Sequence, residues 1–253
     1  MGKKLRLSFR GTSDIQAIIR HYIPSGTYTR VSTSSTVRVE SETVCLIWSP
    51  SYVGEGLLRI LGQVKGHVRK RFREGLVAKV DHKPRYESVG SIGRAARAVE
   101  LDLSSAYLSA AYKIGAISPQ VKDRLSKVSK HSRLMTLGCL ASRATVQEYV
   151  AWAKVSTAAK YDVETGEVWT RIVAEVDRTM QELAKSAGRQ FLYYWCDAVF
   201  VEPSAAEEVE RKAAILGYHM KKKAVIMGVF GKMSRYIGVN DGRKFSLRKR
   251  AAT

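Results

Sequence analysis

The feature that most constrains the fold is a short apolar segment with one acidic residue near its middle. Residues 191–202 read FLYYWCDAVFVE, so Asp197 has aromatic or β-branched residues on both sides. Such residues favour strands, and a carboxylate among them is costly to bury unless it is paired or coordinates a cation. We therefore expect a buried strand on which Asp197 has a partner, with an edge-strand aspartate that faces solvent as the alternative.

The chain beyond residue 94 alternates between helix and strand patterns. Capping residues and apolar residues at helical spacing predict helices at 104–114, 120–130, 133–160, 168–186 and 204–216. Runs rich in β-branched and aromatic residues predict strands at 98–103, 191–202, 224–229 and 235–239. This order predicts the α+β class, with an antiparallel sheet covered by helices on one face.

The first 80 residues predict a separate, smaller α+β lobe. Strand patterns occur at 27–31, 36–39 and 44–48, and helix patterns at 13–22 and 57–74. Pro84, Gly90 and Gly93 mark the best domain boundary. The predicted division is a basic N-terminal lobe at 1–88, a second domain at 89–242 and a basic tail at 243–253.

Charge indicates the class of partner. The chain has 43 Lys and Arg against 23 Asp and Glu, a net charge of +20, and such an imbalance is self-repulsive unless an anionic partner neutralises it. Nucleic acid is the expected partner. A merely soluble basic surface is one alternative, and an anionic membrane surface is disfavoured because the basic segments lack a strong apolar face.

Cysteine use and hydropathy predict a soluble cytoplasmic protein that is not secreted. Cys45, Cys139 and Cys196 form no C-x-x-C pair, which indicates neither a zinc site nor a disulfide framework. No apolar run approaches the roughly 18 residues that span a bilayer, and the first residues lack the apolar core of a secretion signal. We expect a location in the host-cell cytoplasm or at the nucleoid.

A second acidic residue stands where a predicted strand meets a predicted helix. Residues 100–109 read ELDLSSAYLS, so Asp102 is followed at once by small and hydroxyl residues that open a helix. This order places a carboxylate beside the unpaired N–H groups of a helix start, which can hold a metal ion and a polyphosphate together. A plain helix cap is the alternative for this segment taken alone.

Together the two acidic segments resemble motifs of the family B DNA polymerases. Residues 102–107, DLSSAY, match motif A, D-x-x-S-L-Y, except for Ala106. In YYWCDAVFV, residues 193–201, Tyr193, Asp197 and the VFV run match motif C, Y-x-D-T-D-S-V-F-V. Between them, Lys130 and Gly138 keep the separation of the fingers motif K-x-x-x-N-S-x-Y-G, and residues 234–236 stand where the K-x-Y motif would fall. The resemblance covers residues 95–240 and is nearest the compact, protein-primed branch.

The resemblance implies a polymerase palm at 89–242, with reduced fingers at about 118–145, that performs template-directed nucleotidyl transfer. Asp102, Asp197 and the backbone carbonyl of Leu103 would hold two Mg²⁺ or Mn²⁺ ions, and Tyr107 would stack under the sugar of a deoxynucleoside triphosphate. The nucleotide-binding residues implied are Ser104, Ser105, Ala106, Tyr107, Lys127, Lys130, Arg133 and Gly138. DNA, as a primer-template or a single strand, would be the second substrate.

Basic residues outside these motifs are expected to contact nucleic acid. They lie in the 57–74 helix, in the lysine run at 221–223, around the K-x-Y position and in the tail. They are Lys65, Arg69, Lys70, Arg71, Arg73, Lys221, Lys222, Lys223, Lys232, Arg235, Tyr236, Arg243, Lys244, Arg248, Lys249 and Arg250.

Several departures from the family pattern limit the expected activity. Trp195 replaces the first Asp of motif C, Leu134 the fingers Asn, and Leu137 the fingers Tyr. The first 90 residues are too few for an exonuclease domain, and the 17 residues after Tyr236 are too few for a thumb. We therefore expect a viral or mobile-element enzyme whose partner subunits supply thumb, exonuclease or processivity functions.

Two other functions stay open at this point. The first is a palm-like domain without catalysis that binds nucleic acid within a replication or nucleoprotein assembly, which the departures favour. The second is an RNA virus polymerase core, since the string DLSSA also occurs in such enzymes. No G-D-D follows it in this chain.

Overall fold

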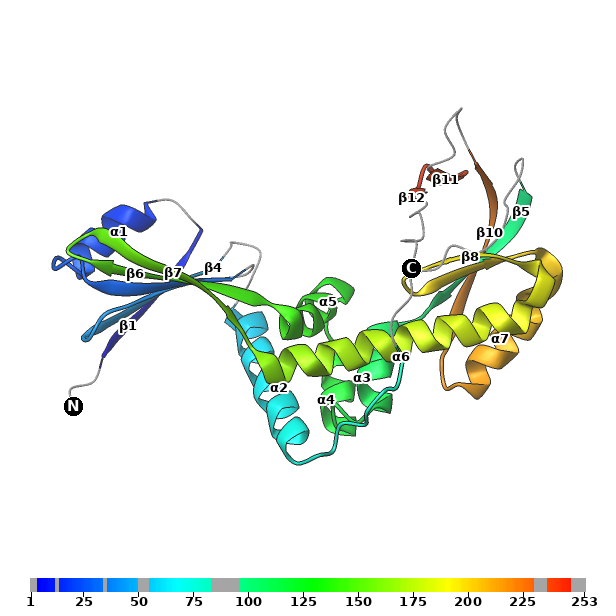
Figure 1. Cartoon of the computed structure of the whole chain (residues 1–253), viewed down its shortest axis with the longest axis horizontal. Coiled ribbons are helices and arrows are strands. Elements are labelled where there is room, and N and C mark those ends of the chain that lie inside the picture. The colour runs from blue at the N-terminus through cyan, green and yellow to red at the C-terminus, as the bar shows by residue number, and fades with distance from the viewer. Residues whose placement is uncertain are drawn as a thin grey trace. The chain divides into compact units, whose positions relative to one another are not determined.

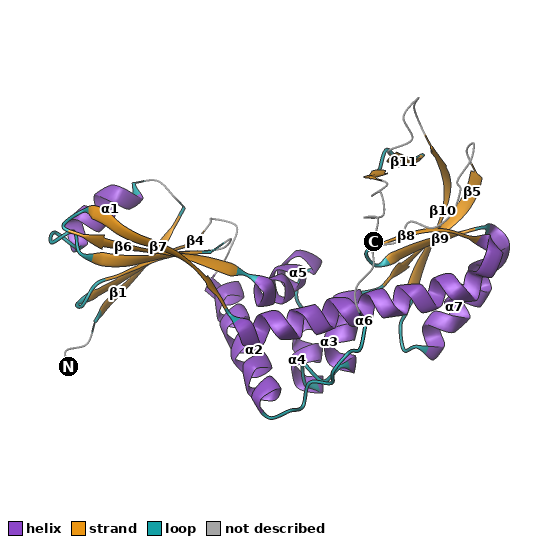
Figure 2. Cartoon of the chain, in the orientation of Figure 1, coloured by secondary structure: helices purple, strands orange, loops and turns teal. Residues whose placement is uncertain are grey.

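The computed structural model describes residues 4–11, 14–33, 36–49, 55–82, 96–229 and 236–246. The chain divides into two compact units (Figures 1 and 2). Unit 1 comprises Met1–Leu76 and Ile117–Thr170, and unit 2 comprises Val77–Ala116 and Arg171–Thr253. The predicted α+β class is confirmed, because each unit combines one six-stranded sheet with helices.

This division differs from the one expected at residue 88. The structure groups residues 117–170, which include the expected fingers region, with the N-terminal residues. The last crossing between units falls inside the helix α6 (Val163–Ala187), between Thr170 and Arg171. A helix has no Pro or Gly signal at such a point, so composition could not indicate it.

Unit 1 is built on a mixed sheet. Its strands are β1 (Leu5–Arg10), β2 (Tyr28–Ser32), β3 (Val37–Glu40), β4 (Val44–Ser49), β6 (Arg143–Val150) and β7 (Ala153–Tyr161). They are ordered β1-β4-β3-β2-β6-β7, with β1 parallel to β4 and the other pairs antiparallel. The helices are α1 (Ile15–Tyr22), α2 (Glu55–Arg73), α4 (Pro119–Ser126) and α5 (Lys130–Gly138), followed by a 3-10 turn at Cys139–Ala141.

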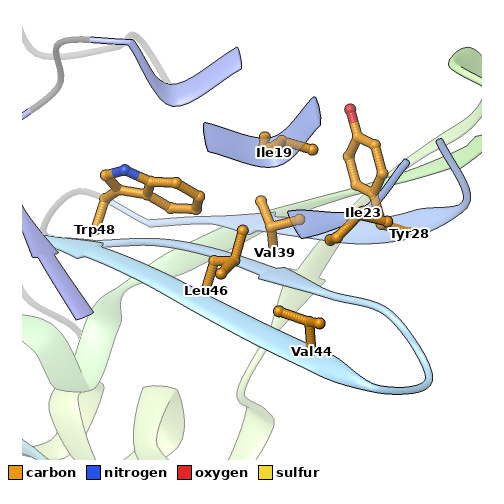
Figure 3. Close-up of a cluster of buried hydrophobic side chains, with 7 residues drawn as sticks. All are labelled: Ile19, Ile23, Tyr28, Val39, Val44, Leu46 and Trp48. Atoms are coloured by element: carbon orange, nitrogen blue, oxygen red, sulfur yellow. The ribbon is translucent and has the colours of Figure 1, made fainter. Parts of the chain in front are cut away.

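The helix α1 closes the core of this sheet. Figure 3 shows Ile19 of α1 lying above Val39 and Leu46, with Trp48 beside them. Ile19 and Leu46 are fully buried. The apolar face of α1 thus supplies the burial that this sheet needs to be stable.

The predicted helix at 133–160 is wrong beyond Gly138. Residues 143–161 form the antiparallel hairpin β6–β7, which joins the sheet through β2. Its two turn residues, Ala151 and Trp152, have φ angles of 48° and 69°, a conformation usually taken by Gly, Asn or Asp. Alanine is a poor strand former, and the turn lacks the residues that mark hairpins. Pairing with a distant strand therefore outweighed local propensity.

Unit 2 is built on an antiparallel sheet, as predicted. Its strands are β5 (Ala96–Leu103), β8 (Phe191–Trp195), β9 (Ala198–Val201), β10 (Met220–Val229), β11 (Tyr236–Val239) and β12 (Lys244–Ser246). Their order is β12-β11-β10-β5-β9-β8. Its helices are α3 (Ala106–Lys113), the second part of α6, and α7 (Ala206–Ile215), with 3-10 turns at Gly188–Gln190 and Pro203–Ala205. In this sheet β5 lies between β10 and β9. The helices α3 and α6 follow β5 along the chain, and α7 connects β9 to β10.

The sheet of unit 2 has two different faces. Helices α6 and α7 run along one side of it (Figure 1). On that side the Tyr194 hydroxyl donates to Asp177 of α6 at 3.1 Å, and Leu101 and Leu103 are buried. Because alternate residues of a strand point to opposite faces, Glu100 and Asp102 lie on the other side. We call these the helix face and the aspartate face.

Candidate functional site

Asp102 lies on the aspartate face near the end of the central strand β5. It is directly opposite Ala198 of β9 and Lys221 of β10. Its neighbours Leu101 and Leu103 are 0% and 1% exposed against the helices, whereas Asp102 is half-buried. The strand is therefore anchored by its apolar side and presents the carboxylate on the other.

Asp197 lies in a turn, so the prediction of one strand across residues 191–202 is wrong. Trp195 pairs with Ala198, which leaves Cys196 and Asp197 as the two-residue turn of the β8–β9 hairpin. Cys196 has a φ of 52°, and hairpin turns of two residues commonly need such angles. The half-buried Asp197 carboxylate thus stands at a strand end, where burial costs less than in mid-strand.

The backbone joins the two aspartate segments directly. The amide of Leu103 donates to the carbonyl oxygen of Asp197 at 2.8 Å. Asp102 is opposite Ala198, so Asp197 is one residue further along the neighbouring strand. Ladder geometry then separates the two Asp Cα atoms by roughly 6 Å. Residues 95 positions apart in sequence, 102 and 197, are thereby brought to one edge of the sheet.

The residues after Asp102 form a tight corner that starts α3. The amide of Ser104 donates to the His219 carbonyl at 2.8 Å, and Ser105 has a φ of 55°. Helix α3 begins at Ala106, and the Ser105 side chain makes no capping hydrogen bond to it. Ser105 therefore does not cap the helix with its side chain, which was the alternative for this segment. Tyr107 lies in the first turn of α3.

An ion-pair network lies on the aspartate face behind Asp102. Glu100 is only 6% exposed, and Arg243 binds both of its carboxylate oxygens, with Nη1 to Oε1 at 2.6 Å. Arg243 Nε also donates to Asp241 at 2.8 Å. The bond with Glu100 raises the pKa of Arg243, and the bond from Arg243 lowers the pKa of Asp241. Arg243, expected to contact nucleic acid, is thus committed to contacts within unit 2.

The three lysines of β10 have different surroundings. Lys222 lies on the helix face and binds Glu210 of α7 at 3.0 Å. Lys223, opposite Glu100, binds Asp241 at 2.8 Å. Lys221, opposite Asp102, is exposed and has no ion pair with any described residue. One member of the predicted basic run therefore lies beside the candidate site.

The expected fingers residues belong to unit 1, whereas Asp102 and Asp197 belong to unit 2. Lys130 begins α5, where the Ser129 hydroxyl accepts from the Ser132 amide. Lys127 forms a 2.7 Å ion pair with Asp123. Arg133 and Gly138 lie within α5. Their contacts with a nucleotide stay a prediction.

Most of the basic residues of α2 are bound within unit 1, two of them at the β7–α6 corner. Arg69 binds Asp162, Arg73 binds Glu164 at 2.7 and 2.9 Å, and Lys65 donates to Ser142 at 3.2 Å. The salt bridge lowers the pKa of Glu164 and raises that of Arg73. Lys70 forms a looser pair with Glu74 at 3.8 Å, and Arg71 is the fifth expected contact on this helix.

The same corner contains one basic and one aromatic residue that the sequence interpretation missed. A pocket of about 430 Å³ is lined by Lys65, Arg69 and Arg73 together with Lys160 and Tyr161 at the end of β7. The mistaken helix over 133–160 included Lys160 and ended directly before Tyr161. The sequence shows a Lys-Tyr pair just before Asp162. This pair indicates a place in the pocket only when residues 153–161 are recognised as the strand β7.

The remaining expected contacts lie near the C-terminus. Tyr236 begins β11 and Lys244 begins β12. Lys232, Arg235, Arg248, Lys249 and Arg250 lie outside the described residues.

Among the described residues, no group of three or more His, Cys, Asp or Glu side chains is arranged to hold a metal ion. The expected site needs only two carboxylates with a backbone carbonyl, so it does not depend on such a group. No helix in the described part of the chain is both long and apolar enough to span a membrane. Comparison with protein-family models, curated proteins and solved structures found no match to this chain.

Proposed function

We propose that the chain performs template-directed nucleotidyl transfer, adding a deoxynucleotide to a DNA primer at a site formed by Asp102 and Asp197. The observation that supports this most is the 2.8 Å hydrogen bond between Leu103 and Asp197, which brings both aspartate segments to one sheet edge. Motif order alone would not require that proximity.

The donor set fits two hard divalent cations. Carboxylate oxygens are the ligands that Mg²⁺ and Mn²⁺ prefer, and the backbone holds half-buried Asp102 and Asp197 at neighbouring positions. Two such divalent cations would activate the primer 3′-hydroxyl and stabilise the leaving pyrophosphate. The protein's own part is to fix the two carboxylates on a strand end and on a hairpin turn.

The start of α3 is suited to the nucleotide. The Ser105 side chain does not cap this helix, so we assign the first amides of α3, beginning at Ala106, to the triphosphate. Tyr107, in the same turn, would pack under the sugar. Leu103, whose amide holds the Asp197 carbonyl, would offer its own carbonyl to a cation.

A net charge of +20 supports a nucleic-acid substrate. The pocket of unit 1 lined by Lys65 and Lys160 is a further candidate contact for phosphate. Partner subunits would supply the thumb, exonuclease or processivity functions.

One observation favours a second candidate, a nucleic-acid-binding domain without catalysis. Trp195 stands where motif C has its first Asp, and it packs against the apolar cluster that contains Tyr193 and Phe200. Its ring lies 6.5 Å from that of Tyr193 at 19°. A stacked aromatic at this position suits base stacking better than metal binding.

Primer extension separates the two candidates. Wild type should extend a labelled primer with Mg²⁺ or Mn²⁺, and Asp102→Ala and Asp197→Ala should each lose extension while they keep DNA binding. Asp81→Ala, which removes an exposed carboxylate from the same unit, is the control. DNA binding without extension by wild type favours the second candidate. Extension that survives both substitutions rejects the site.

A further inference from the structure

Lys221 differs from its two neighbours in having no partner within the described chain. Successive side chains of β10 alternate between faces. Lys222 therefore binds Glu210 on the helix face, and Lys223 binds Asp241 within the Arg243–Glu100 network. The exposed Lys221 ammonium has no hydrogen bond or ion pair with any described residue.

Its place in the sheet is next to the candidate metal ligand. The strand registers align Trp195 of β8, Ala198 of β9, Asp102 of β5 and Lys221 of β10 in one row across the aspartate face. Directly opposed residues of antiparallel strands have Cβ atoms about 4.5–5.5 Å apart. Ala198 is thus directly opposite Asp102 on one side, and Lys221 is directly opposite it on the other.

We propose that Lys221 is a substrate-binding residue of the Asp102–Asp197 site, where its ammonium binds a phosphate oxygen of the group that reacts there. This inference rests on the proposed function. An exposed lysine opposite an aspartate would ordinarily pair with it. When the Asp102 carboxylate binds divalent cations, it does not pair with the Lys221 ammonium. The ammonium can then bind the phosphate that these cations also attract. A compact ammonium on a flexible stem is a common phosphate ligand.

Two sources could supply that phosphate: the triphosphate of the incoming nucleotide and the terminal phosphodiester of the primer. The chemistry is the same for both. Loss of the lysine distinguishes them. The deoxynucleoside triphosphate binds more weakly in the first case, and the primer-template binds more weakly in the second.

The test compares Lys221→Gln with Lys222→Gln, which removes the same charge from the opposite face of the same strand. Lys185→Gln, an exposed lysine at the end of α6, controls for net charge. Single-nucleotide incorporation gives the KM for the triphosphate, and fluorescence anisotropy gives the Kd for the primer-template. Thermal unfolding checks that each variant folds.

We expect Lys221→Gln to raise one of these constants by about tenfold, as for the loss of one charge-assisted hydrogen bond. A raised KM identifies the nucleotide as the source, and a raised Kd identifies the primer. Lys221→Arg should recover most of the loss. Lys222→Gln should have a smaller effect, and Lys185→Gln should match wild type.

If wild type is active and Lys221→Gln changes both constants no more than Lys222→Gln does, the inference is overturned and the proposed function stands. A change confined to thermal stability also overturns it, because Lys221 would then have only a structural role. A wild-type chain that incorporates no nucleotide overturns both.

Discussion

The backbone amide of Leu103 donates a 2.8 Å hydrogen bond to the carbonyl oxygen of Asp197. This bond extends the β5–β9 ladder by one residue into the hairpin turn. It fixes the turn at the end of the strand that carries Asp102. The position of the Asp197 carboxylate therefore depends on the geometry of a two-residue turn.

That dependence predicts how the turn responds to glycine. Cys196 has a φ of 52°, which costs an ordinary residue roughly 1 kcal/mol and glycine almost nothing. Cys196→Gly should therefore change the free energy of unfolding by less than about 1 kcal/mol, since relief of strain offsets the greater freedom of the unfolded chain.

Cys139→Gly is the matched control, because Cys139 is another half-buried cysteine but has a φ of −65°. It gains no relief of strain and should lose about 1 kcal/mol. Urea unfolding of both variants measures the difference. Equal losses would mean that the turn at Cys196 does not have the left-handed geometry.

The buried Glu100 predicts a strong dependence on Arg243. Removing one partner of a buried pair leaves an unpaired charge and costs about 3–5 kcal/mol when both partners are fully buried. The Arg243 side chain is 39% exposed, so we expect Arg243→Met to cost about 2 kcal/mol, after discounting for solvent screening.

Glu100→Gln combined with Arg243→Met should recover much of that loss, because no buried charge is then left alone. A double-mutant cycle in urea measures the coupling. Additive effects of the two substitutions would show that the Arg243–Glu100 pair does not form in solution.

The buried Tyr218 predicts a loss of stability at alkaline pH. Burial raises the pKa of Tyr218 to about 12, from an ordinary value of 10.0. The unfolded chain therefore loses this proton at lower pH than the folded chain does. The stabilisation is fully present below about pH 10 and is lost as the pH rises toward 12, by at most about 1.4 kcal/mol per pH unit.

Tyr218→Phe keeps the ring and removes the proton, so its free energy of unfolding should fall less steeply than that of wild type between pH 10 and 12. Tyr112→Phe, which changes an exposed ring, is the control. Urea titrations at several pH values give both slopes. Parallel curves for wild type and Tyr218→Phe would contradict the burial of this hydroxyl.

Local patterns were enough to predict much of unit 2. The small residues after Asp102 indicated the strand-to-helix corner, and the apolar stripe of residues 168–186 indicated α6. These signals act within one turn or one strand. The same holds for three strands near the N-terminus. The bounds predicted there from β-branched residues agree with those of β2, β3 and β4 to within one residue.

The rest depended on contacts between residues that are distant in sequence. Arg243 and Glu100 are 143 positions apart, and no local pattern links them. The turns at Ala151–Trp152 and Cys196–Asp197 contain no glycine, so a helix was predicted for the first hairpin and one continuous strand for the second. In both, strand pairing imposes left-handed backbone angles that the residues alone would not favour.

The central claim is that Asp102 and Asp197 together hold a pair of divalent cations. Electron paramagnetic resonance of Mn²⁺ bound to the chain with primer-template and a deoxynucleoside triphosphate tests it most directly. We predict two bound ions with the magnetic coupling of a pair about 3.5–4 Å apart, lost in both Asp102→Asn and Asp197→Asn. An Mn²⁺ signal that is the same in wild type and in the Asp102→Asn, Asp197→Asn double variant would contradict the claim.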